Sequence, residues 1–302
     1  MNFSRMVCVA LMLSSSMAMA DGISLVVQDD YFTGTDRGYT DGTELMWSWS
    51  PSETNSAVIK NALGIRNRMY TPDSLEAHTL QPWERPYCAT LSAFYQVWRH
   101  EDDELVKYEL EAGVLGPSAM GEQFQTAVHH LIKDTIPQGW NEQLQPDEPI
   151  LNAYMERWHP LGYVGDASCW QMRMDGLYGG AFGTTFINAL GGVCGKAGWN
   201  IPADAAGGTV LANGNGGWFA FLFVEPRARV VALNATLGNS LFNDRENERS
   251  LCPVVGELEG GITIGRGGFA ITYSDVSSSR EFDHQNLKQS YGNLRIDYTW
   301  TF

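Results

Sequence analysis

Residues 116–134, GPSAMGEQFQTAVHHLIKD, carry the side chains of this chain that are best suited to chemistry. Their apolar positions lie three and four residues apart, the spacing of a helix, and form the stripe Phe124, Val128 and Leu131. Gln125 and His129 follow on a neighbouring stripe, within side-chain reach of each other. A histidine held in this way could act as a general base. The alternative is a loop helix whose histidines, at positions 129 and 130, are ordinary surface residues.

The rest of the chain alternates apolar and polar residues, which predicts the strands that must position this helix. In DELVKYELEAGVLG, residues 103–116, apolar side chains alternate with Lys107, Glu109 and Glu111. Three charges on one face would be costly in a small core, whereas a polar barrel lumen accepts them. Thirteen such segments occur, at 23–29, 42–50, 57–70, 87–99, 103–116, 150–158, 168–178, 182–190, 216–225, 228–237, 255–265, 268–275 and 292–302. Bacterial barrels have even strand numbers, so we expect one segment to be false or merged, leaving about twelve.

The two ends of the sequence indicate export to an outer membrane. The first twenty residues have a basic start, an apolar centre and an Ala-Met-Ala cleavage site, which predicts a secretory signal peptide at 1–20. The last ten residues, NLRIDYTWTF, place aromatic side chains on one face and end at Phe302, as the last strand of an outer-membrane barrel does. The alternative is an ordinary sandwich strand. We expect one domain over 21–302.

Composition is consistent with that fold. After the leader no run approaches the roughly 18 apolar residues of a membrane helix, so a chain that crosses a membrane here must do so as a closed barrel. The expected fold class is all-β: a transmembrane antiparallel β-barrel of about 12 strands, with a short α-helix in an extracellular loop. The formal charge of −15 argues against nucleic acid as a partner.

Four cysteines follow the expected cleavage site, namely Cys88, Cys169, Cys194 and Cys252. An even number in an oxidising compartment makes disulfides possible, with Cys169 and Cys194 the nearest pair in sequence. The pairing cannot be deduced from the sequence. None of the four has zinc-finger spacing.

Several motifs in order resemble the outer-membrane lipid A deacylase (LpxR-like) family. They are VVQDDYF at 26–32, TDRGYTDG at 35–42, MYTPDS at 69–74, ERPYCATL at 84–91, GPSAMGEQFQTAVHHL at 116–131 and GWNEQL at 139–144. The resemblance implies a calcium-dependent esterase that removes the 3′-linked acyloxyacyl group of lipid A. It therefore implies lipopolysaccharide of the outer leaflet as partner, Ca²⁺ as cofactor and the outer membrane as location. We expect a monomer.

The resemblance also assigns roles to individual residues. The family's histidine base falls on His129, its Asn-Asp pair falls on Gln28 and Asp29, and its threonine falls on Thr40. Asp134 lies nearest to the position of a family glutamate. Asp29 is the expected metal ligand, in a segment that also offers carboxylates at 30, 36 and 41, since calcium prefers oxygen ligands.

Three positions depart from the family pattern. Gln28 is longer than asparagine, and Asp41 replaces an amide with a charge. A family lysine after Met-Tyr-Thr-Pro has no match, and His78, Arg85 and Arg68 are the candidates to supply its charge. These departures leave open a shifted substrate, weak activity or none.

The expected chemistry is ester hydrolysis in which His129 deprotonates a water that attacks the acyl carbonyl. Gln125 is a candidate substrate-binding residue, and so are Arg68 and Arg85, because the guanidinium of arginine binds phosphate well. Arg37 and Arg66 are further candidates, and any of these arginines could instead pair with Glu109 or Glu111 in a lumen. No G-x-S-x-G elbow supports a serine nucleophile. The alternatives are a non-enzymatic channel or structural barrel, and a degenerate family member that binds lipid A without cleaving it.

Overall fold

The computed structural model describes residues 21–34, 38–50, 58–79, 81–101, 104–166, 169–211, 217–245 and 247–300. The expected leader at 1–20, the candidates Asp36 and Arg37, and the terminal Phe302 lie outside these residues. Among the helices that are described, none has the length and apolar character needed to cross a membrane.

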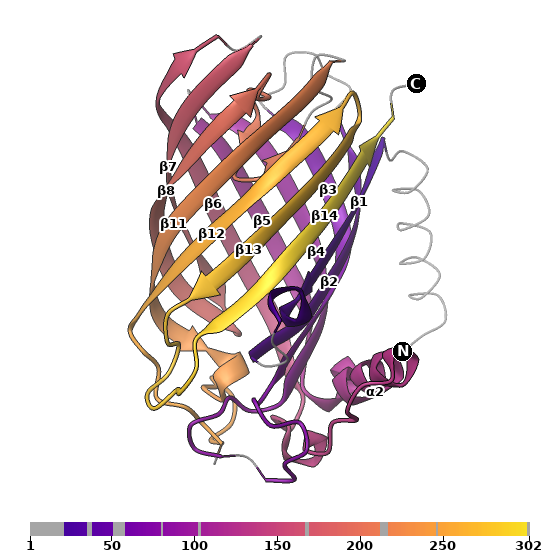
Figure 1. Ribbon diagram of the computed structural model, residues 1–302. Helices are drawn as coiled ribbons and strands as arrows, with labels where there is room; N and C mark the ends of the chain where they lie inside the picture. Colours follow the sequence, from indigo (N-terminus) through magenta and orange to yellow (C-terminus); the bar gives the residue numbers. More distant parts are fainter. Residues whose placement is uncertain are drawn as a thin grey trace, which may run out of the picture.

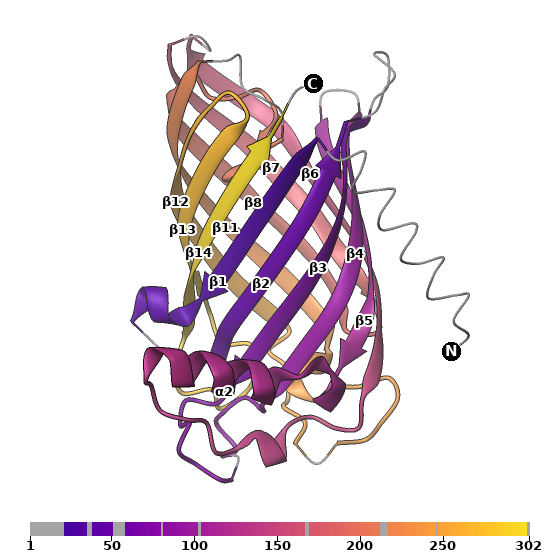
Figure 2. The same ribbon diagram turned by 90° about the vertical axis from the view of Figure 1, so that its right-hand side faces the viewer.

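Twelve antiparallel strands form a closed barrel, in which β1 pairs with both β2 and β14 (Figures 1 and 2). This confirms the expected fold class and strand number. The expected segments 216–225 and 228–237 are parts of one long strand, β11. The barrel strands are β1 Gly22–Asp29, β2 Gly38–Trp49, β3 Val58–Thr71, β4 Cys88–Glu101, β5 Glu104–Leu115, β6 Glu148–Gly165, β7 Trp170–Gly183, β8 Phe186–Trp199, β11 Trp218–Asn234, β12 Val254–Arg266, β13 Phe269–Ser278 and β14 Gln289–Thr299.

The predicted alternation separates a charged lumen from an apolar outer wall. On β5, Glu109 and Glu111 are 5% and 4% exposed, whereas Leu110 between them is 63% exposed on the outside. Arg66 of β3 lies between the two glutamates, with Nη1 2.7 Å from Glu109 and 3.4 Å from Glu111. Val106 is an exception to the exposed outer row, because it is fully buried at a position flanked by cross-strand arginines. The charges that would be intolerable in a small core are thus neutralised by ion pairs inside the barrel.

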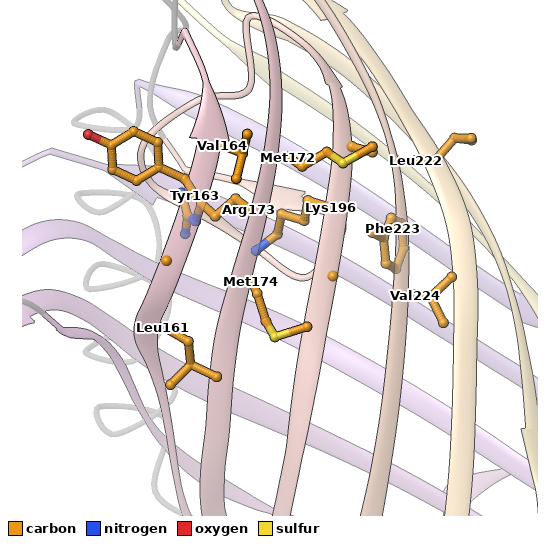
Figure 3. A pocket seen from close by; sticks show the side chains of 13 residues that line it. Leu161, Tyr163, Val164, Met172, Arg173, Met174, Lys196, Leu222, Phe223 and Val224 are labelled. Carbon is orange, nitrogen blue, oxygen red and sulfur yellow. The ribbon is translucent and has the colours of Figure 1, made fainter.

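The outer wall is apolar, and it is hollowed into a groove where glycines stand in place of larger side chains. A groove of about 660 Å³ crosses β6, β7, β8 and β11. Figure 3 shows Met172 and Met174 from β7 with Leu222 and Val224 from β11 around it. A Cβ added at Gly195, which lines this groove, would meet no atom within 4 Å. This surface is suited to acyl chains rather than to water.

The lumen is filled at one end by a segment that sequence periodicity did not predict. Residues 200–211, between β8 and β11, include the short strands β9 Ala205–Ala206 and β10 Thr209–Val210. Ala205 and Val210 pack against three inward phenylalanines of β11, at 219, 221 and 223. The carbonyl of Gly208 accepts hydrogen bonds of 2.9 Å from the hydroxyls of Thr263 and Thr272. The segment is therefore a plug bonded to the barrel wall.

The connection from β5 to β6, residues 116–147, carries the expected helix. It contains η2 Pro117–Ala119, α2 Gly121–Ile132 and η3 Trp140–Glu142. The backbone N–H of Ser118 donates to Asp147, and Met120 in a left-handed conformation precedes the helix. Long loops of such barrels lie outside the cell, which places α2 at the extracellular end. Figures 1 and 2 show α2 lying crosswise on the outside of the barrel wall, near the ends of β2, β3 and β4.

The four candidate disulfide cysteines are all unpaired. Cys194 of β8 is opposite Asp175 of β7, whereas Cys169 precedes β7 by one residue. The nearest pair in sequence is thus separated along the barrel wall by several residues.

Candidate active site

One face of α2 packs on the barrel and carries Gly121, Gln125 and His129, spaced four residues apart. Gly121 permits the close approach, since a Cβ there would lie 2.5 Å from the Cβ of Ala89 on β4 and 2.5 Å from the ring of Trp140. The predicted Gln–His stripe is therefore the docked face of the helix, and the apolar stripe is not.

A small apolar cluster packs at the docked side of the helix. Met69 of β3 and Ala89 of β4 pack there with Ala119, Tyr87 and Trp140. Trp140 is 2% exposed, and its indole N–H donates to Oε1 of Gln125 over 2.8 Å. Gln125 is 1% exposed, and its Nε2 has no hydrogen-bond partner. Gln125 was expected to bind substrate, and in the structure it holds the indole of Trp140 on the docked side of the helix.

The orientation of His129 is set by the turn that follows the helix. Nδ1 of His129 lies 2.5 Å from the carbonyl oxygen of Thr135. A carbonyl can only accept, so Nδ1 carries the hydrogen, and Nε2 is left with its lone pair. His129 is 6% exposed, whereas the neighbouring His130 is exposed. The tertiary contact thus distinguishes the two adjacent histidines and leaves His129 with the nitrogen that a general base needs.

Asp134 shapes that turn. Its side-chain Oδ1 accepts from the backbone N–H of Thr135 over 2.7 Å, and its own N–H donates to the carbonyl of His129. Lys133 before it adopts a left-handed conformation, which ends the helix. Asp134 is exposed, and its hydrogen bonds are with backbone groups, so its contribution is to position the carbonyl of Thr135.

Two carboxylates lie on the barrel rim beside the helix. Asp29 at the end of β1 is directly opposite Asp41 of β2, so both side chains lie on the same face of the sheet. Asp29 accepts from the N–H of Tyr31 over 2.8 Å and thereby caps η1 Asp30–Thr33. Asp29 interacts electrostatically with both His129 and Asp41. Asp29 is thus close enough to His129 for an attraction between them, whereas the like charges of Asp29 and Asp41 repel each other.

Thr40 occupies a bulge next to Asp41. The register between β2 and β3 shifts between Tyr39 and Asp41, which leaves Thr40 as the extra residue. Its hydroxyl lies 2.5 Å from the hydroxyl of Thr71, and both side chains are buried. Bulges often re-aim a side chain beside an active site. Thr71 was missed from sequence, because only the pairing of β2 with β3 brings it to Thr40.

Two other expected site residues, Gln28 and Arg68, are placed in the lumen, away from this face. Gln28 lines a cavity in the lumen, where its Oε1 accepts from the hydroxyl of Tyr39 over 2.6 Å. Arg68 lines the same cavity, 3.9 Å from Glu44 and from Glu111. Adjacent strand residues point to opposite faces, so Gln28 and Asp29 cannot both face His129.

Arg85 is 4% exposed, and its guanidinium already binds other side chains of the protein. Its guanidinium donates to Glu281 over 2.8 Å, to Gln289 over 3.1 Å and to Thr236 over 2.9 Å. It also stacks 4.2 Å from the ring centre of Tyr70. His78, the third candidate for the missing lysine, is exposed in the loop from β3 to β4. Arg66 follows the alternative expectation of a lumen arginine paired with glutamates.

The rim carboxylates suit a calcium ion. Asp41 has a buried Oδ1 without a hydrogen-bond partner, facing a second carboxylate on the paired strand. Two adjacent anions and an unpartnered oxygen call for a cation, and calcium takes carboxylate, carbonyl and water oxygens together. Across the part of the chain that the structure describes, no group of three or more His, Cys, Asp or Glu side chains is clustered for a metal. Asp29 and Asp41 could hold such an ion only with further oxygen ligands from backbone groups and water.

The fold and this site define an integral outer-membrane β-barrel with a histidine site on its outer wall, at the extracellular rim. The chain belongs to the family described as "Outer membrane protein LpxR", whose model matches residues 6–300. Among curated proteins, none matches the sequence significantly.

One solved structure in particular shares the fold. LpxR from Salmonella typhimurium is 19% identical, with a TM-score of 0.79, over 92% of this chain and 100% of that chain. The β domain of the Bordetella autotransporter Brka is 9% identical, with a TM-score of 0.46, over 94% of this chain and 99% of that chain. A KdgM porin bound to oligogalacturonate is 6% identical, with a TM-score of 0.38, over 93% and 99%. The last two likenesses are too distant to carry an argument.

Proposed function

We propose that this protein is an esterase of the outer leaflet that hydrolyses the 3′-linked acyloxyacyl chain of lipid A. The observation that carries the proposal is the setting of His129 on the outer wall, with Nδ1 held by Thr135 and with Asp29 beside it. Membership of the LpxR family supports the same reaction and location. A site on the outer wall suits a substrate that diffuses in the plane of the membrane.

Each side chain of the site has its own role in the proposed reaction. Nε2 of His129 takes a proton from a water molecule, whose oxygen forms a bond to the acyl carbonyl carbon. The ester C–O bond then breaks, the fatty acid leaves, and the proton returns from the imidazolium to the sugar oxygen. Asp29 stabilises the imidazolium by its charge, and Asp134 keeps the Thr135 carbonyl on Nδ1. Thr40 is placed to orient the water or the substrate.

Calcium is the cofactor that we propose for Asp29 and Asp41. When bound, it polarises the acyl carbonyl and stabilises negative charge on its oxygen. The proposal is supported by the unpartnered Oδ1 of Asp41 and by the facing carboxylates.

The plug argues against the second candidate function, an open channel. Residues 200–211 occupy the lumen, and ion pairs such as those of Arg66 cross it. A channel also has no need of a histidine fixed on the outer wall. A family member that binds lipid A without cleaving it would keep the same geometry, so only an activity measurement separates it from the enzyme.

Mass spectrometry of lipid A after incubation with purified protein and calcium tests the proposal. We expect loss of the acyloxyacyl mass, no loss with chelator, and no loss with His129→Ala. The matched control is His130→Ala, which changes the adjacent exposed histidine and should retain activity. An intact lipid A mass with folded wild-type protein, over several lipid A types, would leave lipid A binding as the function. Equal loss of activity in both histidine variants would refute the assignment of the base.

A further inference from the structure

Helix α2 presents three different sides, and only one of them touches the barrel. The docked side carries Gln125 and His129. A second side is polar, with Gln123 and His130 exposed. The third side exposes large apolar side chains to the surroundings, and Leu131 among them is 82% exposed. Its members are Phe124, Val128 and Leu131, which we call the apolar side of α2, and Ile132 and Met120 at the helix ends are also exposed.

The contacts of the helix show which way the apolar side points. The chain after α2 returns along the helix on its extracellular side, where Thr135 binds His129 and Trp140 binds Gln125. Around the helix axis, successive residues turn by 100°, so Phe124 and Val128 lie on the flank of the docked side that is opposite to the flank carrying His129. The apolar side therefore points away from the extracellular side, toward the level of the membrane-spanning strands. In Figure 2 the helix lies across the strands, as a helix in the plane of the membrane does.

We infer that α2 is an interfacial helix, whose apolar side lies among the acyl chains of the outer leaflet. The outer wall below it is the lipid-facing surface of the barrel, with Leu91 of β4 exposed at the adjacent level. The helix and the wall thus form one continuous apolar surface, which lipid covers. A run of three large apolar side chains facing water would be an aggregation liability on a folded protein. An amphipathic helix at the headgroup boundary places its apolar side among the acyl chains and its polar side in water.

An interfacial α2 holds the base at the depth of its substrate, and this part rests on the proposed function. The ester bonds of lipid A lie between sugar headgroup and acyl chains, at the level where an interfacial helix lies. His129 is on the docked side, between the helix and the wall. An ester reaches it by lateral movement from the membrane, without leaving the lipid phase.

Spin labelling tests the membrane contact without any activity. The labelled variants are Leu131→Cys on the apolar side and, as matched control, Gln123→Cys on the polar side of the same helix. Both are made with Cys169→Ser and Cys252→Ser, since the two other thiols that follow the leader are buried. In liposomes of phospholipid and lipopolysaccharide, the label at 131 should collide more with oxygen than with a water-soluble nickel complex. The label at 123 should show the reverse, and equal exposure of both labels to nickel would overturn the inference.

A second measurement separates the inference from the proposed activity. In the double variant Phe124→Ser, Leu131→Ser, hydrolysis of bilayer lipid A should fall about tenfold or more, because seating of the helix is lost. Hydrolysis of the same lipid dispersed in detergent should fall far less. A wild-type protein without hydrolysis would defeat the proposed function, yet the labels would still decide the position of α2. Equal loss on both substrates would contradict the interfacial role.

Discussion

Gly121 is the residue through which the docking of α2 is best tested. In Gly121→Ala the new Cβ would lie 2.5 Å from the Cβ of Ala89 and 2.5 Å from the ring of Trp140. Ordinary carbon contacts are about 3.5–4.0 Å, so the helix start must move outward by roughly 1 Å. His129 lies two turns further on the same docked side and moves with it. A displacement of about 1 Å costs on the order of a hundredfold in rate, which is about 2.7 kcal/mol of transition-state stabilisation.

The direction of the effect makes this prediction informative. Alanine is favoured over glycine inside helices by about 1 kcal/mol, so helix propensity alone predicts a neutral or stabilising change. The assay is the initial rate of acyl release from lipid A, with barrel folding checked by heat-modifiable mobility in gels. Ala127→Val is the control, because it adds bulk at an exposed position of the same helix and should keep the rate. A wild-type rate for Gly121→Ala would refute the reasoning that tight docking positions the base.

Three further predictions concern the support of the site, the cation and the lumen. Gln125→Leu leaves the buried Trp140 N–H without its acceptor, which should weaken docking of α2 by about 1–3 kcal/mol and appear as faster proteolysis of residues 116–147. Asp29→Asn and Asp41→Asn should each weaken calcium binding by about tenfold or more in titration calorimetry, and an unchanged affinity would remove them as ligands. Arg66→Met leaves the buried Glu109 without its main cationic partner and Glu111 with one guanidinium fewer, so unfolding in urea should show a loss of about 3–5 kcal/mol. Arg229→Met, at a more exposed ion pair with Glu257, is the control and should cost less.

Much of the barrel could be predicted because its signal is local. Alternation along one strand shows which side chains face a lumen, and the outward Leu110 between the inward Glu109 and Glu111 confirms it. The helix could also be predicted from the sequence, because its apolar residues lie three and four positions apart, whereas those of the surrounding strands lie two apart. The strand count was less clear, because alternation breaks near Pro226 and divided β11 into the two expected segments 216–225 and 228–237.

The roles of individual polar residues depended on contacts between distant segments. Arg68 and Arg85 were candidates for substrate phosphates, and the structure places them beside acidic partners instead. Gln28 and Asp29 are adjacent in sequence but lie on opposite faces of β1. The plug at 200–211 also escaped prediction, because its apolar residues are short runs without a strand or helix period.

The sequence by itself determined the class of fold, the presence of a helix within residues 116–134 and the candidate histidines. Tertiary structure alone decided which histidine is held, which carboxylates face each other and which side of the helix meets the wall. Thr135 follows His129 closely, but the turn at Asp134 had to form before its carbonyl could reach Nδ1. Asp29 and Asp41 meet only through the register of β1 with β2. Periodicity is a property of neighbouring residues, whereas register, barrel closure and helix docking are set by the packing of residues far apart in the chain.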